Sequence, residues 1–416
     1  MFLIYQILVS ILLITSPIFI LIRILKNKED KKRYIEKYSV PSKERRNGNL
    51  IWFHGASVGE ILSIIPLIRF YEKKNNVEQI LVTTSTLSSS KVIKKFKFKK
   101  TIHQFFPIDH FFFVNKFLNH WKPNIAIFIE SEVWPYMFKK IYNKKISLVL
   151  LNARLTKKTF KRWIKIKFFS RLIFKKIKIA YPQNIETGKF LKELNVKKVY
   201  QLGNLKFAQN NDINQNKISD NFKIKLSGKK TWVASSTHSG EEIFCAKAHI
   251  KLKEKIKNLI TIIIPRHVHR VDEIRSEIEK LNLKIALHSN KPNNLKNIDI
   301  YLIDTFGETN IFHQIGATVF IGGSIVKRGG QNPLEAARYG AKILHGPNTD
   351  NFKDVYKLLK KLNVSEKIIT PNQLASSIKF NKNKKTGVKI KNIGAKILKK
   401  TIKELDNLIN NEFEKT

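Results

Sequence analysis

Apolar residues in this chain gather into short runs, and each run is followed by a turn of small or polar residues and then by a stretch with helical spacing. The runs in the first half that we expect to be strands are 49–53, 79–83, 125–129 and 146–151, with an apolar turn around 179–182. Runs that are apolar at every position are typical of parallel strands covered on both faces. Strands that alternate with helices in this way predict an α/β fold.

A second series of the same kind opens after a polar stretch without pattern, which begins at Gln209. Its expected strands are 231–234, 259–264, 298–303, 317–321 and 342–345. Because 416 residues exceed one ordinary core, we expect two facing Rossmann-like domains with a cleft between them. The expected boundaries are 26–206 for the first domain, 207–228 for the linker and 229–416 for the second domain, whose basic C-terminal helix packs back across the domains.

The segment before the first domain is apolar enough to enter a membrane. Residues 2–22 contain no charge, and a basic cluster that starts at Arg23 follows directly. The segment lacks the basic start and the small-residue cleavage site of a signal peptide, so we expect residues 1–25 to be an uncleaved anchor. The positive-inside rule then places the remaining chain in the cytoplasm. The alternative is a helix that lies in the membrane surface, and Pro17 would kink a spanning helix.

The charge balance favours polyanionic partners. The formal net charge is +46, from 78 Lys and Arg against 32 Asp and Glu, which fits nucleic acid, an anionic membrane or a phosphorylated substrate. The lone cysteine, Cys245, excludes an internal disulfide and a cysteine-based metal cluster. The sequence contains no dinucleotide fingerprint, Walker loop or convincing metal-ligand spacing, so we expect neither a cofactor nor a metal.

Phenylalanine is interleaved with lysine and histidine between residues 96 and 117. Such a stretch can stack on bases, or it can present apolar side chains and cations to an anionic membrane. The plainer interpretation is that most of these phenylalanines belong to the core.

Carboxylates follow two of the expected strands of the first domain, at the edge of the sheet where α/β folds bind ligands. Glu60 follows the first strand and is spaced from Ser57 as in a capping box, but it also stands where a general base would stand. Glu130 and Glu132 follow a later strand. Arg154, after the next strand, could pair with one of these glutamates or with the acid group of a ligand.

The second domain has polar groups at the same kind of edge. Arg266 follows a strand where it can bind a phosphate or a base, or form a salt bridge. Gly307 and the N–H groups after it can cradle an anion. A helix start completes the set, because Asn332 suits the N-cap, Pro333 the first helical position and Glu335 the third. Free N–H groups and the helix dipole favour an anion there, although Asn332 and Glu335 could merely cap their own helix.

Several short blocks together resemble those of bacterial 3-deoxy-D-manno-octulosonic acid (Kdo) transferases. The blocks are SVGE at 57–60, ESEVWP at 130–135, NARLT at 152–156, GNLKF at 203–207, STHSGEE at 236–242, PRHVHR at 265–270, DTFGE at 304–308 and GGSIVKRGGQNPLEAA at 322–337. They occur in the order found in the family, and the resemblance runs from the N-terminal segment nearly to the C-terminus. Each block is weak alone, but the set is highly specific.

The resemblance implies a GT-B fold and transfer of Kdo from CMP-Kdo to a lipid A precursor, lipid IVA, on the cytoplasmic face of the bacterial inner membrane. It implies a metal-free, inverting reaction in lipopolysaccharide synthesis, with Glu60 as general base and with Glu130 and Lys206 stabilising the transition state. The positions that match the CMP-binding segments are Pro265, Arg266, Phe306, Gly307, Glu308, Asn332, Pro333, Leu334 and Glu335. The chain departs from the family pattern at Ala208, Phe306 and Gln331, where relatives often have Asp, Met and His. Because the acceptor implied by the resemblance carries acyl chains, residues 96–117 become candidates for acceptor binding.

Two alternatives stay open at this point. One is a GT-B transferase for another nucleotide sugar, which differs in the nucleotide that stabilises the protein. The other is a membrane-tethered nucleic-acid-binding protein, which the positive net charge and the stretch 96–117 favour. The second alternative leaves the carboxylates at the strand ends without a role, so we expect no nucleic acid as a partner.

Overall fold

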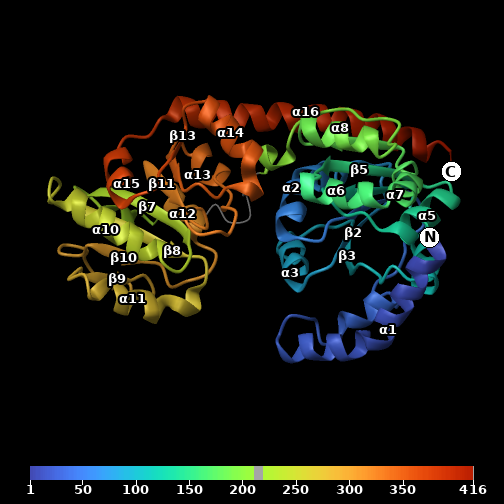
Figure 1. Cartoon of the computed structure of the whole chain (residues 1–416), viewed down its shortest axis with the longest axis horizontal. Helices are drawn as coiled ribbons and strands as arrows, with labels where there is room; N and C mark the ends of the chain where they lie inside the picture. Colours follow the sequence, from blue (N-terminus) through green and yellow to red (C-terminus); the bar gives the residue numbers. More distant parts are fainter. Residues whose placement is uncertain (210–218, 416) are drawn as a thin grey trace. The chain divides into compact units, whose positions relative to one another are not determined.

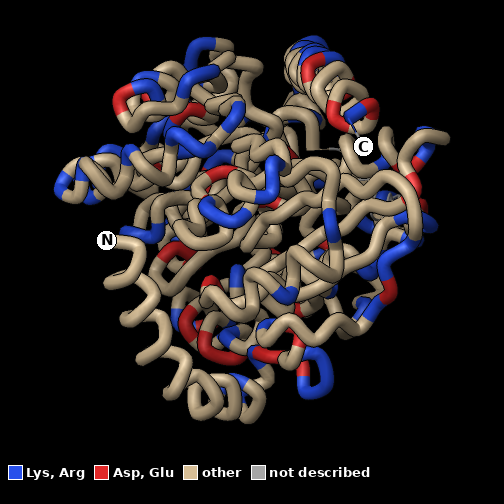
Figure 2. Tube along the Cα trace, turned by 90° about the vertical axis from the view of Figure 1, so that its right-hand side faces the viewer, with Lys and Arg blue, Asp and Glu red and all other residues tan. Residues whose placement is uncertain are grey.

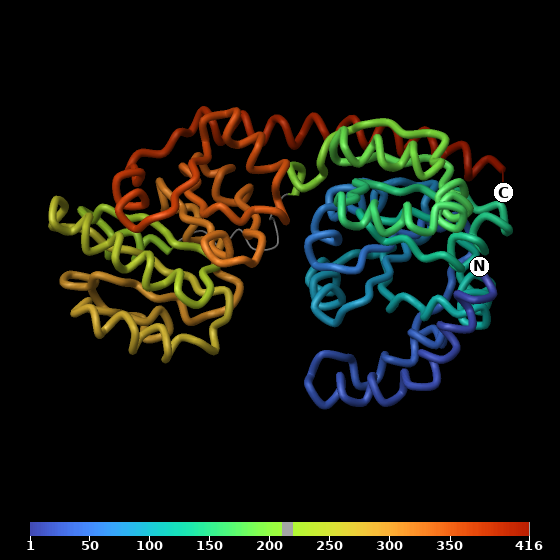
Figure 3. Tube along the Cα trace, viewed as in Figure 1, coloured from blue at the N-terminus to red at the C-terminus, as the bar shows by residue number. Residues whose placement is uncertain are grey.

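The computed structural model describes residues 1–209 and 219–415 of the chain. The chain divides into two compact units, one formed by residues 1–210 with 393–416 and the other by residues 211–392. Each unit is built around a parallel sheet covered by helices (Figure 1). Figure 3 traces the first unit mainly from blue to green and the second from yellow to orange.

The first unit contains a six-stranded sheet in the order β3-β2-β1-β4-β5-β6. Its strands are β1 Leu50–His54, β2 Gln79–Thr84, β3 Thr101–Phe105, β4 Ile125–Ile129, β5 Ser147–Ala153 and β6 Ile179–Pro182. All neighbouring strands run parallel, so their carboxyl ends share one edge of the sheet. The sequence predicted four of these strands, whereas it offered 179–182 as a turn and did not predict β3.

Helices cover both faces of this sheet and enclose a hydrophobic cluster on each. The helices of this unit are α1 Phe2–Leu25, η1 Arg33–Tyr38, α2 Val58–Tyr71, α3 Leu87–Lys95, α4 Phe111–Trp121, α5 Pro135–Asn143, α6 Lys157–Lys165, α7 Lys167–Phe174, α8 Ile185–Glu193 and η2 Leu205–Ala208. Trp52, Phe117 and Phe128 pack in one cluster, and Ile61 and Ile127 pack in the other. Within 96–117, Phe105 and Phe117 are core residues, so the core interpretation holds for part of the stretch, while Phe111 and Phe112 are exposed.

The second unit contains a seven-stranded parallel sheet in the order β13-β12-β11-β7-β8-β10-β9. Its strands are β7 Lys230–Thr237, β8 Leu259–Pro265, β9 Ile285–Leu287, β10 Ile300–Leu302, β11 Thr318–Ile321, β12 Lys342–His345 and β13 Ser365–Lys367. The apolar runs predicted five of them. The sequence did not predict β9 and β13 because each has only three residues and lies at an edge of the sheet, where no continuous apolar run is needed.

The helices of the second unit are mostly short. They are α9 Asp220–Lys225, α10 Glu241–Lys253, η4 Val268–Arg270, α11 Val271–Glu279, α12 Thr309–His313, α13 Leu334–Arg338, η5 Asp350–Phe352, α14 Lys353–Lys361 and α15 Pro371–Ser377. The last helix, α16 Lys384–Phe413, begins in this unit and ends in the first.

Three of the expected domain boundaries need correction. Phe207 and Ala208, which we expected to begin the linker, are buried in the first unit, and α9 at the other end of the expected linker is a helix of the second. Residues 210–218 of the expected linker lie outside the described residues. The second domain ends at residue 392 rather than 416, because Leu405 and Ile409 of α16 are buried in the core of the first unit.

Candidate active site

The carboxyl edge of the first sheet brings together Glu60, Glu130, Glu132 and Lys206. They stand on three elements: Glu60 in the first turn of α2, the other two glutamates just past β4, and Lys206 in η2. All four belong to residues 1–210. Apolar strands that are buried along their whole length deliver these side chains to the edge, so the site rests on the rigid part of the unit.

Glu60 bends back over the loop that joins β1 to α2. Its backbone N–H donates to Ser57 Oγ at 3.3 Å, Ser57 Oγ donates to its Oε1 at 2.9 Å, and Ala56 N–H donates to its Oε2 at 2.8 Å. The expected capping box is therefore only half present, because the carboxylate binds the N–H of Ala56 instead of that of Ser57. Burial raises the pKa of Glu60 to about 7, and repulsion from Glu130 and Glu132 adds to the shift.

Glu130 is locked in place by an ion pair and by its backbone. It follows β4 with a left-handed φ of 57°, and its Oε1 lies 2.6 Å from Lys206 Nζ. Both side chains are almost completely buried. Asn204 Oδ1 accepts the N–H of Lys206 at 2.9 Å and thereby fixes the start of η2. Lys206 is thus a cation beside Glu130, and Arg154 donates its backbone N–H to the carbonyl of Glu130 at 3.2 Å.

Glu132 is held by a buried histidine that the sequence analysis did not single out. His54 Nε2 lies 3.3 Å from Glu132 Oε2, and the indole N–H of Trp134 donates to the same oxygen at 3.0 Å. Burial lowers the pKa of His54 and outweighs the carboxylate beside it. Burial by itself would raise the pKa of Glu132, but the bonds from His54 and Trp134 lower it. The signal for His54 was its place at the end of β1, directly before the loop that holds Glu60.

These contacts divide the three carboxylates into two kinds. Glu130 has a lysine partner, and Glu132 has two N–H partners from side chains. Glu60, by contrast, binds one backbone N–H and one hydroxyl and feels both neighbouring charges. A carboxyl group whose pKa is about 7 can accept and release a proton near neutral pH, which is the property of a general base.

In the second unit, the predicted residues Pro265 and Arg266 lie at the end of β8. Pro265 is buried, Arg266 is exposed, and the N–H of Arg266 donates to the carbonyl of Thr237 at 2.9 Å. Beside them is a hollow of about 280 Å³ lined by His238, Ser239, His267, Arg270, Val326 and Arg328. Burial lowers the pKa of His238 and of His267, and the positive charges of Arg266 and Arg328 contribute to both shifts. The hollow is therefore electropositive and suited to an anion.

A buried carboxylate holds the glycine-rich loop that borders this hollow. Glu241 accepts the backbone N–H groups of Gly323 at 2.6 Å, Ser324 at 3.0 Å and Ile325 at 2.9 Å, and that of His238 at 3.0 Å. A Cβ at Gly322 would lie 2.3 Å from the carbonyl oxygen of Ser236, so the loop can approach β7 this closely only with glycine there. Glu241 thus fixes the loop that carries Arg328.

The predicted helix start at Asn332 is displaced by one residue. The helix α13 begins at Leu334, and Pro333 takes the N-cap position that we expected for Asn332. Asn332 Oδ1 nevertheless accepts the N–H of Leu334 at 3.1 Å, so its side chain still binds the helix terminus. Glu335, in the first turn, lies with Oε2 3.9 Å from His313 Nδ1. Pro333 already has helical backbone angles, with φ −83° and ψ −12°, so the difference is a single residue at the helix end.

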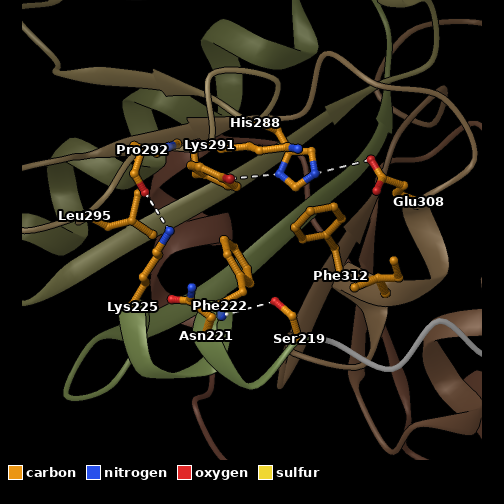
Figure 4. A pocket seen from close by; sticks show the side chains of 12 residues that line it. Ser219, Asn221, Phe222, Lys225, His288, Lys291, Pro292, Leu295, Glu308 and Phe312 are labelled. Atoms are coloured by element: carbon orange, nitrogen blue, oxygen red, sulfur yellow. Dashed lines mark hydrogen bonds and ion pairs between the residues drawn. The ribbon is translucent and has the colours of Figure 1, made fainter.

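The last predicted group, Phe306 to Glu308, forms the turn after β10. Gly307 has a φ of 90°, and the Phe306 side chain is 82% exposed and free of the core. Glu308 turns towards His288, whose Nε2 lies 3.3 Å from Glu308 Oε2, and it also accepts from Thr305 Oγ1 (Figure 4). Glu308 borders a hollow of about 420 Å³ whose walls include Phe222, Tyr301 and Phe312.

Comparison with known proteins identifies the family. A sequence profile described as 3-deoxy-D-manno-octulosonic-acid transferase (kdotransferase) matches residues 32–209. The 3-deoxy-D-manno-octulosonic acid transferase of Rickettsia typhi is 33% identical over 438 residues, which cover 94% of each chain. The chain belongs to the Kdo transferase family. The transferase of Haemophilus influenzae agrees, with 30% identity over 362 residues that cover 84% of each chain.

The family resemblance read from the sequence is therefore confirmed, and the protein is a glycosyltransferase of lipopolysaccharide biosynthesis. This membership favours a Kdo transferase over both alternatives, the nucleic-acid-binding protein and the transferase for another nucleotide sugar. The UDP-GlcNAc 2-epimerase of Neisseria meningitidis matches with a TM-score of 0.52 at 13% identity and covers 85% of this chain and all of its own. At that identity the likeness shows the fold alone, and it confirms the expected two-domain GT-B class for this Kdo transferase.

Proposed function

We propose that this Kdo transferase takes Kdo from CMP-Kdo and transfers it to a lipid A precursor, lipid IVA, with inversion at the anomeric carbon. It would then be a CMP-Kdo:lipid A transferase of the EC 2.4.99 class. The observation that carries the proposal is Glu60, a buried carboxyl with a pKa of about 7 beside a carboxylate–lysine pair at the carboxyl edge of the sheet. An inverting transfer needs one base for the attacking hydroxyl, and this group has the required pKa.

In this mechanism Glu60 accepts the proton of the acceptor hydroxyl while the hydroxyl oxygen bonds to the anomeric carbon of Kdo. The bond from that carbon to the phosphate oxygen breaks, and CMP leaves with the electron pair. The transition state resembles an oxocarbenium ion next to a developing phosphate charge. We assign Lys206 to the stabilisation of negative charge on the donor, and Glu130 to the orientation of the lysine, because their ion pair is short and buried.

For the donor, we assign CMP to residues that follow three strands of the second unit. They are Pro265, Arg266, Phe306, Gly307, Glu308, Asn332, Pro333, Leu334 and Glu335. Their place supports the assignment, because parallel α/β sheets bind ligands outside the carboxyl ends of their strands. Arg266 and Arg328 beside the electropositive hollow supply positive charge for the phosphate, so the proposed reaction needs no metal.

We place the reaction at the cytoplasmic face of the bacterial inner membrane. Among the described residues, α1 is long and apolar enough to enter a bilayer, and Arg23 stands in its last turn. The basic residues that follow favour the cytoplasmic side. The acceptor carries acyl chains, so an enzyme held at the membrane meets it where it resides.

The test is a transfer assay with CMP-Kdo made in situ, a tetraacylated lipid A precursor and a chelator. We expect Glu60→Gln to lose about 100-fold or more of the rate because general-base catalysis contributes about 10² to 10⁴. The matched control is Glu193→Gln, an exposed carboxylate of the same unit, which should react like the native chain. The mass of the product counts the sugars added.

Each outcome bears on a different part of the proposal. Equal rates for native enzyme and Glu60→Gln would overturn Glu60 as the base. No product from a folded native protein that binds CMP would overturn the acceptor and leave the donor assignment standing. Loss of product when the chelator is added only after CMP-Kdo has formed would overturn metal independence.

A further inference from the structure

We propose that α1 does not cross the bilayer but lies in the surface of an anionic membrane, docked lengthwise on the first unit, with Met1 on the same side as both units. This inference concerns topology and does not rest on the proposed transfer reaction. Sequence length and hydropathy allow both a spanning and a surface helix. The contacts of α1 separate the two.

The first half of α1 is hydrogen-bonded to the loop between β3 and α4. Tyr5 Oη donates to Asp109 Oδ2 at 2.7 Å, and Gln6 Nε2 donates to the carbonyl of Asp109 at 3.2 Å. Gln6 also accepts the N–H of Phe111 at 2.7 Å. Phe2 packs edge-on against Phe169 of α7, with ring centroids 5.0 Å apart. One face of the helix is thus built into the unit.

Asp109 is a buried residue of the first unit, so it could not enter the bilayer together with α1. It is 3% exposed, and its carboxylate also accepts the N–H groups of Tyr136 at 2.9 Å and Met137 at 2.7 Å at the start of α5. The residue that binds Tyr5 therefore holds together the core of the first unit. A spanning α1 would have to give up these bonds or draw the unit into hydrocarbon.

The contacts continue down the helix on the same side. Ser10 Oγ lies 3.2 Å from His110 Nε2, and Ser16 Oγ lies 2.8 Å from Tyr38 Oη of η1. From Tyr5 to Ser16 the helix rises by roughly 16 Å, which is about half of the roughly 30 Å hydrocarbon core. Because polar partners from the unit accompany the helix over this length, it cannot be surrounded by lipid.

The opposite face of α1 is apolar and uncovered. Its exposed residues are Leu3, Ile4, Ile7, Leu8, Ile11, Leu12, Ile14, Ile18, Phe19, Leu21, Ile22 and Leu25. Figure 2 shows α1, which descends from the N label, as an almost unbroken tan coil, because its one charged residue is Arg23 in the last turn. A continuous apolar face of this size marks an interaction surface.

The surroundings of this face match an anionic lipid surface. Phe111 and Phe112 at the start of α4 are exposed next to Gln6, and Phe168 is exposed next to Phe169. Phe168 shares a hollow of about 490 Å³ with Lys167, Arg171 and Lys175, and Lys139 lies over the ring of Phe2 at 4.8 Å. Apolar side chains beside cations fit acyl chains beside anionic headgroups, whereas a second copy of this cationic face would repel it.

This arrangement would bring lipid to the edge of the sheet that holds Glu60. Asp109 follows the end of β3, and Tyr136 follows the end of β4, close behind Glu132 and Trp134. The docking site of α1 and the carboxylate site therefore share the carboxyl edge of one sheet. An acceptor in the membrane surface would reach that edge without leaving the lipid.

The first test locates the N-terminus in spheroplasts. A short polar tag with one cysteine is added before Met1, and a membrane-impermeant maleimide is applied before and after permeabilisation. The native Cys245 is buried and its pKa is raised by burial, so its background labelling is low. Lys192→Cys, an exposed site of the first unit, is the control. We expect both cysteines to react only after permeabilisation; labelling of the tag in intact spheroplasts would overturn the proposal.

The second test identifies what covers the apolar face. The detergent-purified full chain is mixed with vesicles of phosphatidylethanolamine and phosphatidylglycerol, or of phosphatidylcholine alone, and bound protein is measured by flotation. Ile7→Asp with Ile11→Asp, both on the exposed face, should reduce binding to anionic vesicles by about tenfold or more. Dimers that persist with no flotation on anionic vesicles would show that a second copy covers the face and would overturn the membrane as partner.

Discussion

At the scale of the residue, the raised pKa of Glu60 makes the rate depend on pH. A base works only when deprotonated, so kcat/KM should rise about tenfold per pH unit below 7 and level off above it. Burial is the main cause of the shift, and the charge of Glu132 adds to it. Glu132→Gln removes that charge and should move the acidic limb to lower pH. The profile of Glu193→Gln should coincide with that of the native enzyme, and an unshifted limb in Glu132→Gln would contradict this account.

The same shift has a consequence for stability. The pKa of Glu60 is higher in the folded protein, about 7, than its ordinary value of 4.5. Its contribution to stability is therefore fully present below pH 4.5 and is lost as pH rises through 7. Ionised Glu60 therefore lowers the stability of the folded protein, and the other interactions of the fold compensate for it, as is common at functional sites.

At the scale of the element, Glu241 decides the conformation of the glycine-rich loop. Glu241→Gln replaces one acceptor oxygen with an NH₂ group, so at least one of the N–H groups of Gly323, Ser324 and Ile325 faces a donor. A buried N–H without its acceptor costs about 1–3 kcal/mol. We expect lower stability in urea and weaker CMP binding by calorimetry. Glu254→Gln, an exposed carboxylate just past the same helix, should change neither.

If Glu241→Gln were as stable as the native chain and bound CMP equally well, the loop would not depend on this carboxylate. If it lost stability but kept CMP affinity, the loop would be structural only. The two explanations are distinguishable because unfolding in urea measures the stability of the unit, whereas calorimetry measures its affinity for CMP.

The sequence predicted the elements whose residues form a recognisable pattern along the chain itself. Strand β4 was predicted to the residue because it is an apolar run buried along its whole length. Strand β3 was not, because its buried His103 and Gln104 are satisfied by Arg33 and Trp121, which lie far along the chain. Partners of this kind cannot be read from local pattern.

The features of the site also divide into those that the sequence predicted and those that it did not. The position of Glu60 after a strand was evident from the sequence, and so was its capping relation to Ser57. The pairing of Glu130 with Lys206 was not evident, because the lysine stands in a short 3₁₀ helix that has no periodic signal, and the sequence offered Arg154 as a partner for one of the glutamates. The family resemblance predicted Lys206 as a site residue, and its position in the first unit explains that prediction.

At the scale of the whole molecule, α16 belongs to both units. A Cβ at Gly387, near its start, would lie 2.7 Å from the carbonyl oxygen of Arg338 in the second unit. Near its end, Leu405 and Ile409 are buried in the core of the first unit, and Glu412 pairs with Lys178 at 2.6 Å. The helix is therefore a structural part of each unit and not an appendage of one.

This division predicts that two alanine substitutions in one helix destabilise different units. Leu405→Ala removes buried side-chain volume from the first unit and Ile390→Ala from the second, each at a cost of about 2–5 kcal/mol. Hydrogen exchange read by mass spectrometry should show faster exchange in β1 and β4 for Leu405→Ala, and in β11 and β12 for Ile390→Ala. Each variant is the control for the other. Equal acceleration in both sheets for either variant would mean that the units unfold as one, and the boundary at residue 392 would have no energetic meaning.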